Sequence, residues 1–254
     1  MDFPLEIGYG NFKLSAHLLS ETLAFVVGYR YYLFLRKDTQ DAISESNRLW
    51  IIIGAAFGAF FFSRLVGSFE VPSGWAKASS YLLYFFQNKT IVGGLLGGLL
   101  GVEFAKKLIH EKHSSGDLFT FPIILAIIIG RVGCFSSGVH EPTFGIETTL
   151  PWGLDLGDGL KRHPVALYEI LFLLILWLGL WMLQKKISFK SGYIFQFFMI
   201  NYYIFRFFLE YIKPVAFYQI GLTGIQMACL FVLGYYSRTL LFLFFKPKKL
   251  VAGF

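Results

Sequence analysis

Ionisable side chains occur inside the most apolar parts of this sequence, where each is costly unless it meets an opposite charge. Arg131 follows the apolar run 118–129 and belongs to the stretch 130–145, which also holds a thiol, hydroxyls, a histidine and a glutamate. Arg206 and Glu210 are four residues apart in a second apolar run, so they share one face of a helix. A guanidinium binds phosphate oxygens in pairs through its planar fork. These residues therefore indicate either phosphate binding or ion pairing with protein carboxylates.

A second group of candidate residues lies where another apolar run begins. Glu169 is about one turn inside the expected helix and needs a cationic partner, for which Arg131 and Arg206 are both candidates. His163 fits either a histidine at the membrane interface or a proton carrier. Tyr168 is typical of the aromatic belt at such an interface.

The composition identifies the structure that must position these residues. Of the 254 residues, 56% are hydrophobic and 15% charged, with a mean hydropathy of +0.59, whereas soluble domains contain about 25% charged residues. A membrane-spanning helix needs about 20 mostly apolar residues. We predict an all-α integral membrane protein in which residues 1–254 form a single transmembrane domain of about seven helices. The expected spans are 17–36, 48–69, 89–109, 117–136, 164–184, 191–212 and 219–245. The apolar piece 81–86 is too short to cross and is expected in the interface.

Charges in the connecting segments predict the orientation. Basic residues occupy or flank the first, third and fifth connections and follow the last span: Arg36, Lys37, Arg48, Lys106, Lys107, Lys112, Lys185, Lys186, Lys190, Lys246, Lys248 and Lys249. The fourth connection, within the expected external loop 137–163, is richer in acidic residues: Glu141, Glu147, Asp155 and Asp158. The N-terminus is therefore predicted outside and the C-terminus in the cytoplasm.

On this topology, charged side chains gather in the outer half of the bilayer: Arg64, Arg131, Arg206, Glu21, Glu70, Glu169 and Glu210. They could form structural ion pairs between helices, but an apolar layer would hold helices equally well. We favour a polar pocket, open to the external leaflet, that receives a phosphate. Glycines spaced four apart predict close helix packing, or alternatively a cavity for a lipid headgroup: Gly54, Gly58, Gly93, Gly97 and Gly101.

Several functions are disfavoured by what the sequence contains. Basic residues do not alternate with aromatic ones on a polar face, so nucleic-acid binding is not expected. Cys134 and Cys229 are the two cysteines, which is too few for a disulfide framework. The histidines lack a convincing metal-ligand spacing, so we expect no metal and no cofactor. The segment 1–13 is polar and does not resemble a cleavable signal peptide.

Several motifs, in order, resemble the prolipoprotein diacylglyceryl transferases: Gly130-Arg131-Val132-Gly133-Cys134-Phe135, Pro151-Trp152-Gly153, His163-Pro164 with Leu167-Tyr168-Glu169, Arg206-Phe207 with Glu210, and Gly224 with Gln226. The resemblance implies a multi-pass protein of the bacterial inner (cytoplasmic) membrane, with seven spans and the N-terminus outside. It also implies transfer of the diacylglyceryl group of phosphatidylglycerol to the lipobox cysteine of a prolipoprotein. The implied partners are phosphatidylglycerol, the signal-peptide region of the prolipoprotein and membrane lipids.

The resemblance also implies roles for individual residues. Arg131 and Arg206 would bind the phosphate and stabilise charge on the leaving group, and Glu169 and Tyr168 would hold them in place. The catalytic candidates are Arg131, Arg206, His163, His140 and Glu169. The substrate-binding candidates are Arg64, Cys134, Tyr168, Glu210 and Gln226.

Departures from the family pattern concern the groups that would handle protons. Leu96 stands where the family usually has a histidine, and Cys134 where it has an asparagine. The usual glutamate is Val139, followed by His140 and Glu141. The base could then be His140, Glu141 or His163. Two alternatives remain: a divergent paralogue that transfers a lipid group to another acceptor, and a non-catalytic lipid-binding membrane protein.

Overall fold

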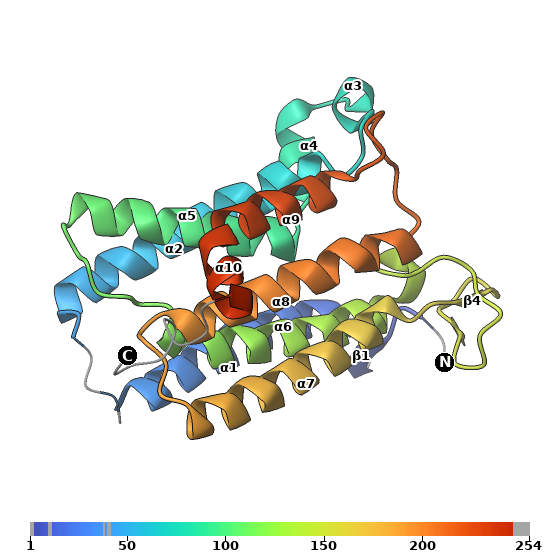
Figure 1. Cartoon of the computed structure of the whole chain (residues 1–254). Helices are drawn as coiled ribbons and strands as arrows, with labels where there is room; N and C mark the ends of the chain where they lie inside the picture. The colour runs from blue at the N-terminus through green and yellow to red at the C-terminus, as the bar shows by residue number, and fades with distance from the viewer. Residues whose placement is uncertain (1–2, 10–11, 38, 40–41, 246–254) are drawn as a thin grey trace. The chain divides into compact units, whose positions relative to one another are not determined.

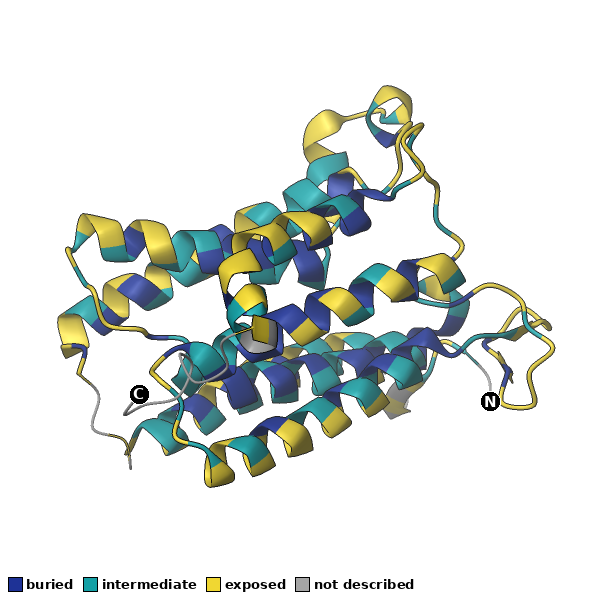
Figure 2. Ribbon diagram, in the orientation of Figure 1, coloured by how far each residue is buried: buried dark blue, intermediate teal, exposed yellow. Residues whose placement is uncertain are grey.

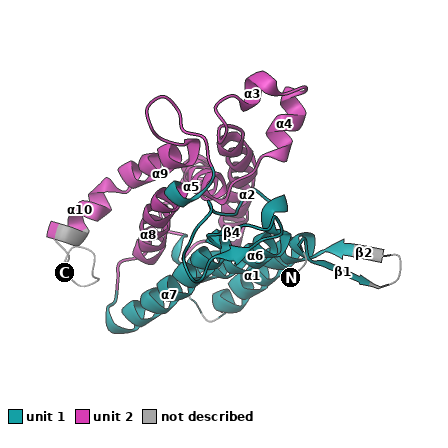
Figure 3. Cartoon of the chain, turned by 90° about the vertical axis from the view of Figure 1, so that its right-hand side faces the viewer, with its two compact units in different colours: residues 1–39, 116–188, 211–214 teal, residues 40–115, 189–210, 215–254 magenta. Residues whose placement is uncertain are grey.

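The protein is mostly helical, as predicted (Figure 1). The structure, a computed structural model, describes residues 3–9, 12–37, 39 and 42–245. The chain folds into two compact units, which are described separately below (Figure 3). Unit 1 comprises residues 1–39, 116–188 and 211–214, and unit 2 comprises residues 40–115, 189–210 and 215–254. The basic residues expected after the last span, Lys246, Lys248 and Lys249, lie outside the described residues.

Unit 1 is built on three long helices: α1 (Ala16–Lys37), α6 (Asp117–Ser137) and α7 (Val165–Lys186). Helix α6 packs against both α1 and α7. Short elements complete the unit: the antiparallel pairs β1 (Glu6–Tyr9) with β2 (Phe12–Ser15) and β3 (Leu154–Asp155) with β4 (Lys161–Arg162), and the 3₁₀ helix η1 (Gly138–His140). The sequence patterns did not predict these strands, because each is only two to four residues long.

Aromatic packing joins the three helices of unit 1. Tyr32 on α1 stacks on Phe119 on α6, with ring centroids 4.4 Å apart. Trp177 on α7 contacts Tyr31 at 5.8 Å and Phe121 at 5.5 Å. This packing brings α1, α6 and α7 together in one compact bundle.

Unit 2 contains the remaining helices of the described chain: α2 (Glu45–Ser68), α3 (Gly74–Lys77), α4 (Tyr81–Gln87), α5 (Ile91–Leu108), α8 (Tyr193–Leu209), α9 (Gly224–Tyr235) and α10 (Ser237–Phe245). The 3₁₀ helix η2 (Glu210–Ile212) follows α8 directly; its first residue, Glu210, belongs to unit 2, and the rest of it belongs to unit 1. Helix α9 packs on α8, α5 and α2. Short helix α4 coincides with the apolar piece 81–86; its place in the membrane interface stays a prediction.

The α2–α5 contact is the most extensive pairing of elements in unit 2. A Cβ atom added to Gly97 would overlap the carbonyl oxygen of Gly58, and one added to Gly101 would overlap that of Gly54. The two backbones therefore touch along this face, as small residues permit between membrane helices. Close packing, one of the two interpretations of the glycine spacing, is confirmed.

Helix length and composition agree with a membrane protein. Within the described residues, three helical segments are long and apolar enough to cross a bilayer: Glu45–Ser68, Asp117–His140 and Val165–Lys186. Exposed residues recur along the long helices (yellow in Figure 2). They include large apolar ones, such as Phe57 with 73% and Ile175 with 63% of its surface exposed. Soluble proteins rarely expose such continuous apolar surface. The protein is thus embedded in a membrane.

Two details differ from the sequence-based expectations. Residues 219–245 do not form one continuous helix: α9 starts only after a capping box at Thr223, and a turn at Tyr236 separates α9 from α10. Arg48, which was counted as a charge flanking a connection, is buried on α2, where its Nη1 donates to the Ser115 carbonyl at 3.5 Å.

Candidate functional site

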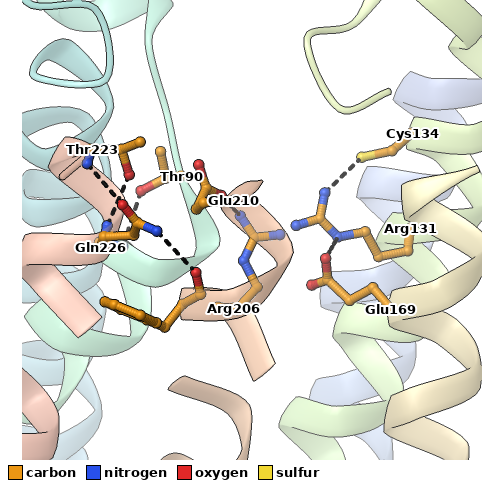
Figure 4. A network of polar contacts seen from close by, with 10 residues as sticks. Thr90, Arg131, Cys134, Glu169, Arg206, Glu210, Thr223 and Gln226 are labelled. Atoms are coloured by element: carbon orange, nitrogen blue, oxygen red, sulfur yellow. Dashed lines mark hydrogen bonds and ion pairs between the residues drawn. The ribbon is translucent and has the colours of Figure 1, made fainter. Parts of the chain in front are cut away.

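The first buried ion pair joins Arg131 of α6 to Glu169 of α7. Arg131 Nε lies 3.0 Å from Glu169 Oε2, and their side chains are 7% and 0% exposed (Figure 4). Helix α7 begins after Pro164, which places Glu169 in the second turn, facing the last turns of α6. Of the two partners that the sequence left open for Glu169, the structure pairs it with Arg131. An isolated buried charge would be strongly destabilising. In this pair, each charge compensates the other.

Arg131 also reaches the thiol one turn further along α6. Its Nη1 lies 3.6 Å from Cys134 Sγ (Figure 4). A small cavity of about 10 Å³ lies beside Cys134, lined in part by Phe135, Thr143 and Pro164. That volume is about the least that holds one water molecule. The loop therefore packs closely around the end of α6.

The second buried ion pair lies within unit 2. Arg206 Nη2 is 3.0 Å from Glu210 Oε1, and the side chains are 5% and 0% exposed. The pair sits where α8 passes into η2, so the four-residue spacing keeps both side chains on one face. The predicted shared face of Arg206 and Glu210 is confirmed.

Gln226 has a positioning contact next to this pair. Its backbone N–H donates to Thr223 Oγ1, and its Oε1 accepts from the Thr223 N–H, both at 3.0 Å, which closes a capping box (Figure 4). Its Nε2 donates to the carbonyl of Phe207 at 3.2 Å. Because Phe207 follows Arg206, Gln226 fixes the start of α9 to the turn of α8 that carries this arginine.

A chain of polar contacts connects loop 137–163 to the start of α7. Trp152 Nε1 donates to the Tyr168 hydroxyl at 2.9 Å, and His163 Nδ1 lies 3.1 Å from the same oxygen. The loop backbone is held to its surroundings here: the His163 N–H donates to Ile146 O, and the Ile146 N–H donates to Ile212 O. Tyr168 thus orients His163. Sequence reasoning treated Trp152 only as part of a family motif and missed this contact.

Acidic side chains organise the tip of the same loop. Asp155 Oδ1 accepts from the backbone N–H groups of Gly157 at 2.9 Å and Gly159 at 3.0 Å, and these bonds lower the pKa of its carboxyl. Arg162 contacts Asp158 Oδ2 through Nε and Nη2, both at 2.7 Å, which lowers the pKa of Asp158. Both carboxyls are thus ionised in the folded loop at neutral pH.

Two other candidates lie apart from these clusters. His140 is exposed at the end of η1. Arg64 on α2 is half-buried and lies against its own helix: its Nη1 donates to Phe60 O and to Ser63 Oγ, both at 3.2 Å, and its guanidinium sits 3.9 Å from the centroid of the Phe60 ring.

The structure adds a histidine that sequence reasoning did not select. His17, at the start of α1, places its Nε2 3.5 Å from Glu141 Oε1 and 4.0 Å from Glu21 Oε2. Its ring also interacts with the Cys134 thiol. Gly133 permits this approach, because a Cβ there would lie 2.8 Å from Ser20 Cβ and 3.2 Å from His17 O. In the sequence, the four-residue spacing of His17 and Glu21 was the one feature that could have indicated His17 as a candidate.

Apolar helices that carry buried arginine–glutamate pairs, together with an ordered polar loop, define an integral membrane protein with a charged interior. A family model described as prolipoprotein diacylglyceryl transferase matches residues 4–243. The chain therefore belongs to the prolipoprotein diacylglyceryl transferase family, as the resemblance indicated.

Individual relatives are named phosphatidylglycerol–prolipoprotein diacylglyceryl transferase. The one from Treponema denticola is 32% identical over 225 residues, which cover 72% of this chain and 66% of the relative. One from Nitratidesulfovibrio vulgaris is 35% identical over 147 residues, covering 52% of this chain and 54% of the relative. One from Campylobacter hominis is 27% identical over 246 residues, covering 89% and 86%. The chain thus spans between about half and two thirds of the length of the first two relatives.

Proposed function

We propose that this protein is a phospholipid-dependent transferase that moves the diacylglyceryl group of phosphatidylglycerol to the lipobox cysteine thiol of a prolipoprotein. The family match supports the reaction class, and the buried Arg131–Glu169 pair is the observation that carries it. We further propose one transmembrane domain, residues 1–254, with seven spans in the bacterial inner membrane. In this topology the N-terminus and loop 137–163 are outside and the C-terminus is cytoplasmic.

The proposed reaction is a displacement at carbon. The acceptor thiolate attacks the glycerol carbon that carries the phosphate, a carbon–sulfur bond forms, and the carbon–oxygen bond breaks. The electron pair stays on the phosphate oxygen, and glycerol-1-phosphate leaves. Negative charge grows on this phosphate in the transition state, so a preorganised guanidinium lowers the barrier.

Arg131 suits this role because its orientation is already set. Glu169 holds Nε, and the side chain is buried, so little reorganisation is needed when a phosphate arrives. We propose the same chemistry for Arg206, held by Glu210. Arg64, Cys134, Tyr168, Glu210 and Gln226 are proposed as substrate-binding residues.

The decisive experiment uses the full-length protein in phosphatidylglycerol vesicles with a lipobox peptide. Release of glycerol phosphate and lipidation of the peptide are measured together. We expect Arg131→Ala and Arg206→Ala each to abolish transfer while the protein stays folded and inserted. Arg30→Ala is the matched control, because this arginine on α1 is exposed. Wild-type turnover in either test variant would refute the role of that arginine.

His163 is proposed to assist proton transfer from its position beside the Tyr168 hydroxyl. His163→Ala should reduce the rate in the same assay, and Tyr168→Phe should reduce it less, because the imidazole remains. An unchanged pH–rate profile in His163→Ala would remove this residue from the acid–base chemistry.

One observation favours a second function. Leu96 on α5 is buried, with 6% of its surface exposed, and cannot accept a proton. A divergent paralogue would use another acceptor, and a non-catalytic lipid-binding protein would need no base. The same assay separates these functions: glycerol phosphate released without lipidated peptide indicates another acceptor, and lipid bound without any release indicates a binding protein.

A further inference from the structure

Titratable side chains from three parts of unit 1 meet at the outer start of α1. His17 and Glu21 belong to α1, Cys134 belongs to α6, and Glu141 directly follows η1. Glu141 Oε1 and Glu21 Oε2 lie 3.5 Å and 4.0 Å from His17 Nε2, and the Cys134 thiol interacts with the imidazole. This cluster adjoins the buried ion pair, because Arg131 Nη1 is 3.6 Å from Cys134 Sγ.

The carboxylates orient the imidazole of His17. Both face Nε2, which favours the neutral tautomer that carries its proton on Nε2. The other ring nitrogen, Nδ1, is enclosed and makes no hydrogen bond of ordinary geometry with any part of the chain that the structure describes. In this tautomer Nδ1 carries the lone pair, on the largely buried ring that the Cys134 thiol also approaches. An imidazole oriented by carboxylates, with one ring nitrogen that carries no proton, is the arrangement of a general base.

We propose that His17 is the base that removes the proton from the acceptor thiol, and that Glu141 is its positioning residue. This inference rests on the proposed transferase function and names the group that activates its acceptor. The thiol proton passes to His17 Nδ1 as sulfur attacks the glycerol carbon, and the electron pair of the broken carbon–oxygen bond stays on the departing phosphate. The imidazolium then releases its proton to water.

The position of His17 relative to Arg131 supports this role. Cys134 contacts both side chains, so the imidazole and the guanidinium are separated by a single thiol side chain. A phosphate held by Arg131 would therefore lie one side chain away from the base. The charges that face this cluster are those of Glu21, Glu141 and Arg131, with Glu169 acting on Cys134 through space.

The other histidines of unit 1 fit this role less well. His163 already engages the Tyr168 hydroxyl through Nδ1. His140 is exposed, and among the residues that the structure describes no contact orients it toward Arg131. Because Leu96 cannot act as a base, His17 would supply a proton-accepting group from a different helix.

The test compares acceptors that do and do not need a base. Full-length wild-type and His17→Gln proteins are assayed in phosphatidylglycerol vesicles with a lipobox peptide that contains cysteine or selenocysteine. A selenol is already ionised at neutral pH, whereas a cysteine thiol, with a pKa of about 8.5, is not. His110→Asn is the matched control: it removes a histidine from the exposed turn after α5, at a φ of 55° that asparagine tolerates.

We expect His17→Gln to lower kcat with the cysteine peptide by about 100-fold, the low end of general-base effects. Its kcat with the selenocysteine peptide and its KM for phosphatidylglycerol should stay close to wild type. Glu141→Gln should give a smaller loss that is also selective for cysteine, and His110→Asn should behave as wild type.

Each outcome decides between a base and a structural histidine. Wild-type turnover of the cysteine peptide by His17→Gln overturns the inference while leaving the transferase function intact. If His17→Gln is inactive on both peptides, Glu141→Gln decides: a cysteine-selective loss supports the inference, and an equal loss on both peptides overturns it. If the wild-type protein lipidates neither peptide, the proposed function fails, and this inference fails with it.

Discussion

Removing one member of the Arg131–Glu169 pair should destabilise the protein, whereas removing both members should not. The charges are 3.0 Å apart and almost fully buried, so their attraction at an effective dielectric constant near 20 is about 5–6 kcal/mol. The cost of taking both charges out of water offsets much of this attraction. Glu169→Met leaves a buried guanidinium without its carboxylate and should reduce the free energy of unfolding by about 3–5 kcal/mol. Arg131→Met should be similarly destabilising.

The double variant Arg131→Met with Glu169→Met removes both buried charges at once. Its stability should return to the wild-type value or exceed it, because an apolar pair of similar volume replaces an ion pair. Its transfer activity should nevertheless be absent, since no guanidinium remains to meet the phosphate. Stability and activity are thereby separated in a single set of variants.

The measurements are denaturant titration of the purified protein in detergent micelles and transfer assays in vesicles. Asp158→Asn is the matched control, because it breaks an ion pair of the same unit that is partly exposed, and exposed pairs contribute little. A double variant as unstable as the single variants would refute the reasoning about compensated charge. A double variant that still transfers lipid would refute the functional role of Arg131.

Three further predictions concern other parts of the chain. Arg206→Lys keeps the charge but loses the planar fork, so it should reduce transfer by more than tenfold without unfolding the protein; wild-type kinetics would argue against bidentate phosphate binding. Gly97→Ala should destabilise the α2–α5 contact by about 1–3 kcal/mol, because its Cβ would overlap the Gly58 carbonyl. The control Gly98→Ala, whose Cβ would have its nearest neighbour at 3.8 Å, should be tolerated, and equal effects would contradict the packing argument. The pKa of Asp155 is lowered by folding, so its contribution to loop stability is complete above the unfolded pKa of about 3.9 and is lost as the pH falls through the folded value. Hydrogen exchange of the loop amides should show protection at pH 5 and its loss in stronger acid, whereas Asp155→Asn should weaken protection at both values.

Hydrophobic runs predicted most of the long helices, because each run is much longer than the apolar runs in helices of soluble proteins. The bounds of α1 and α6 agree with the expected spans 17–36 and 117–136 to within one residue at either end. The range 219–245 was less well predicted, because hydropathy does not register the capping box at Thr223 or the turn at Tyr236. Local hydrogen bonds decide such boundaries, and apolar content does not report them.

The ion pairs of the candidate site could be predicted where the sequence offered a charged residue few possible partners. Glu169 had two possible arginines, and helix spacing alone placed Glu210 beside Arg206. His17 was missed because its neighbours, Glu141 and Cys134, are more than a hundred residues away in the sequence. The closeness of α1 and α6 depends on Gly133, whose importance appears only when Ser20 is found against it.

The glycine contact between α2 and α5 has a consequence for how the protein is inserted into its membrane. Backbone atoms touch directly where Gly58 meets Gly97 and where Gly54 meets Gly101, so no flexible side chain is present at these points to fill a gap if the helices separate. Attraction between close-packed atoms falls steeply with distance, so the pair gains most of its stability only once it is fully closed. Lipid chains must leave this seam before it closes. The two helices are therefore expected to join late and abruptly, after each has entered the bilayer.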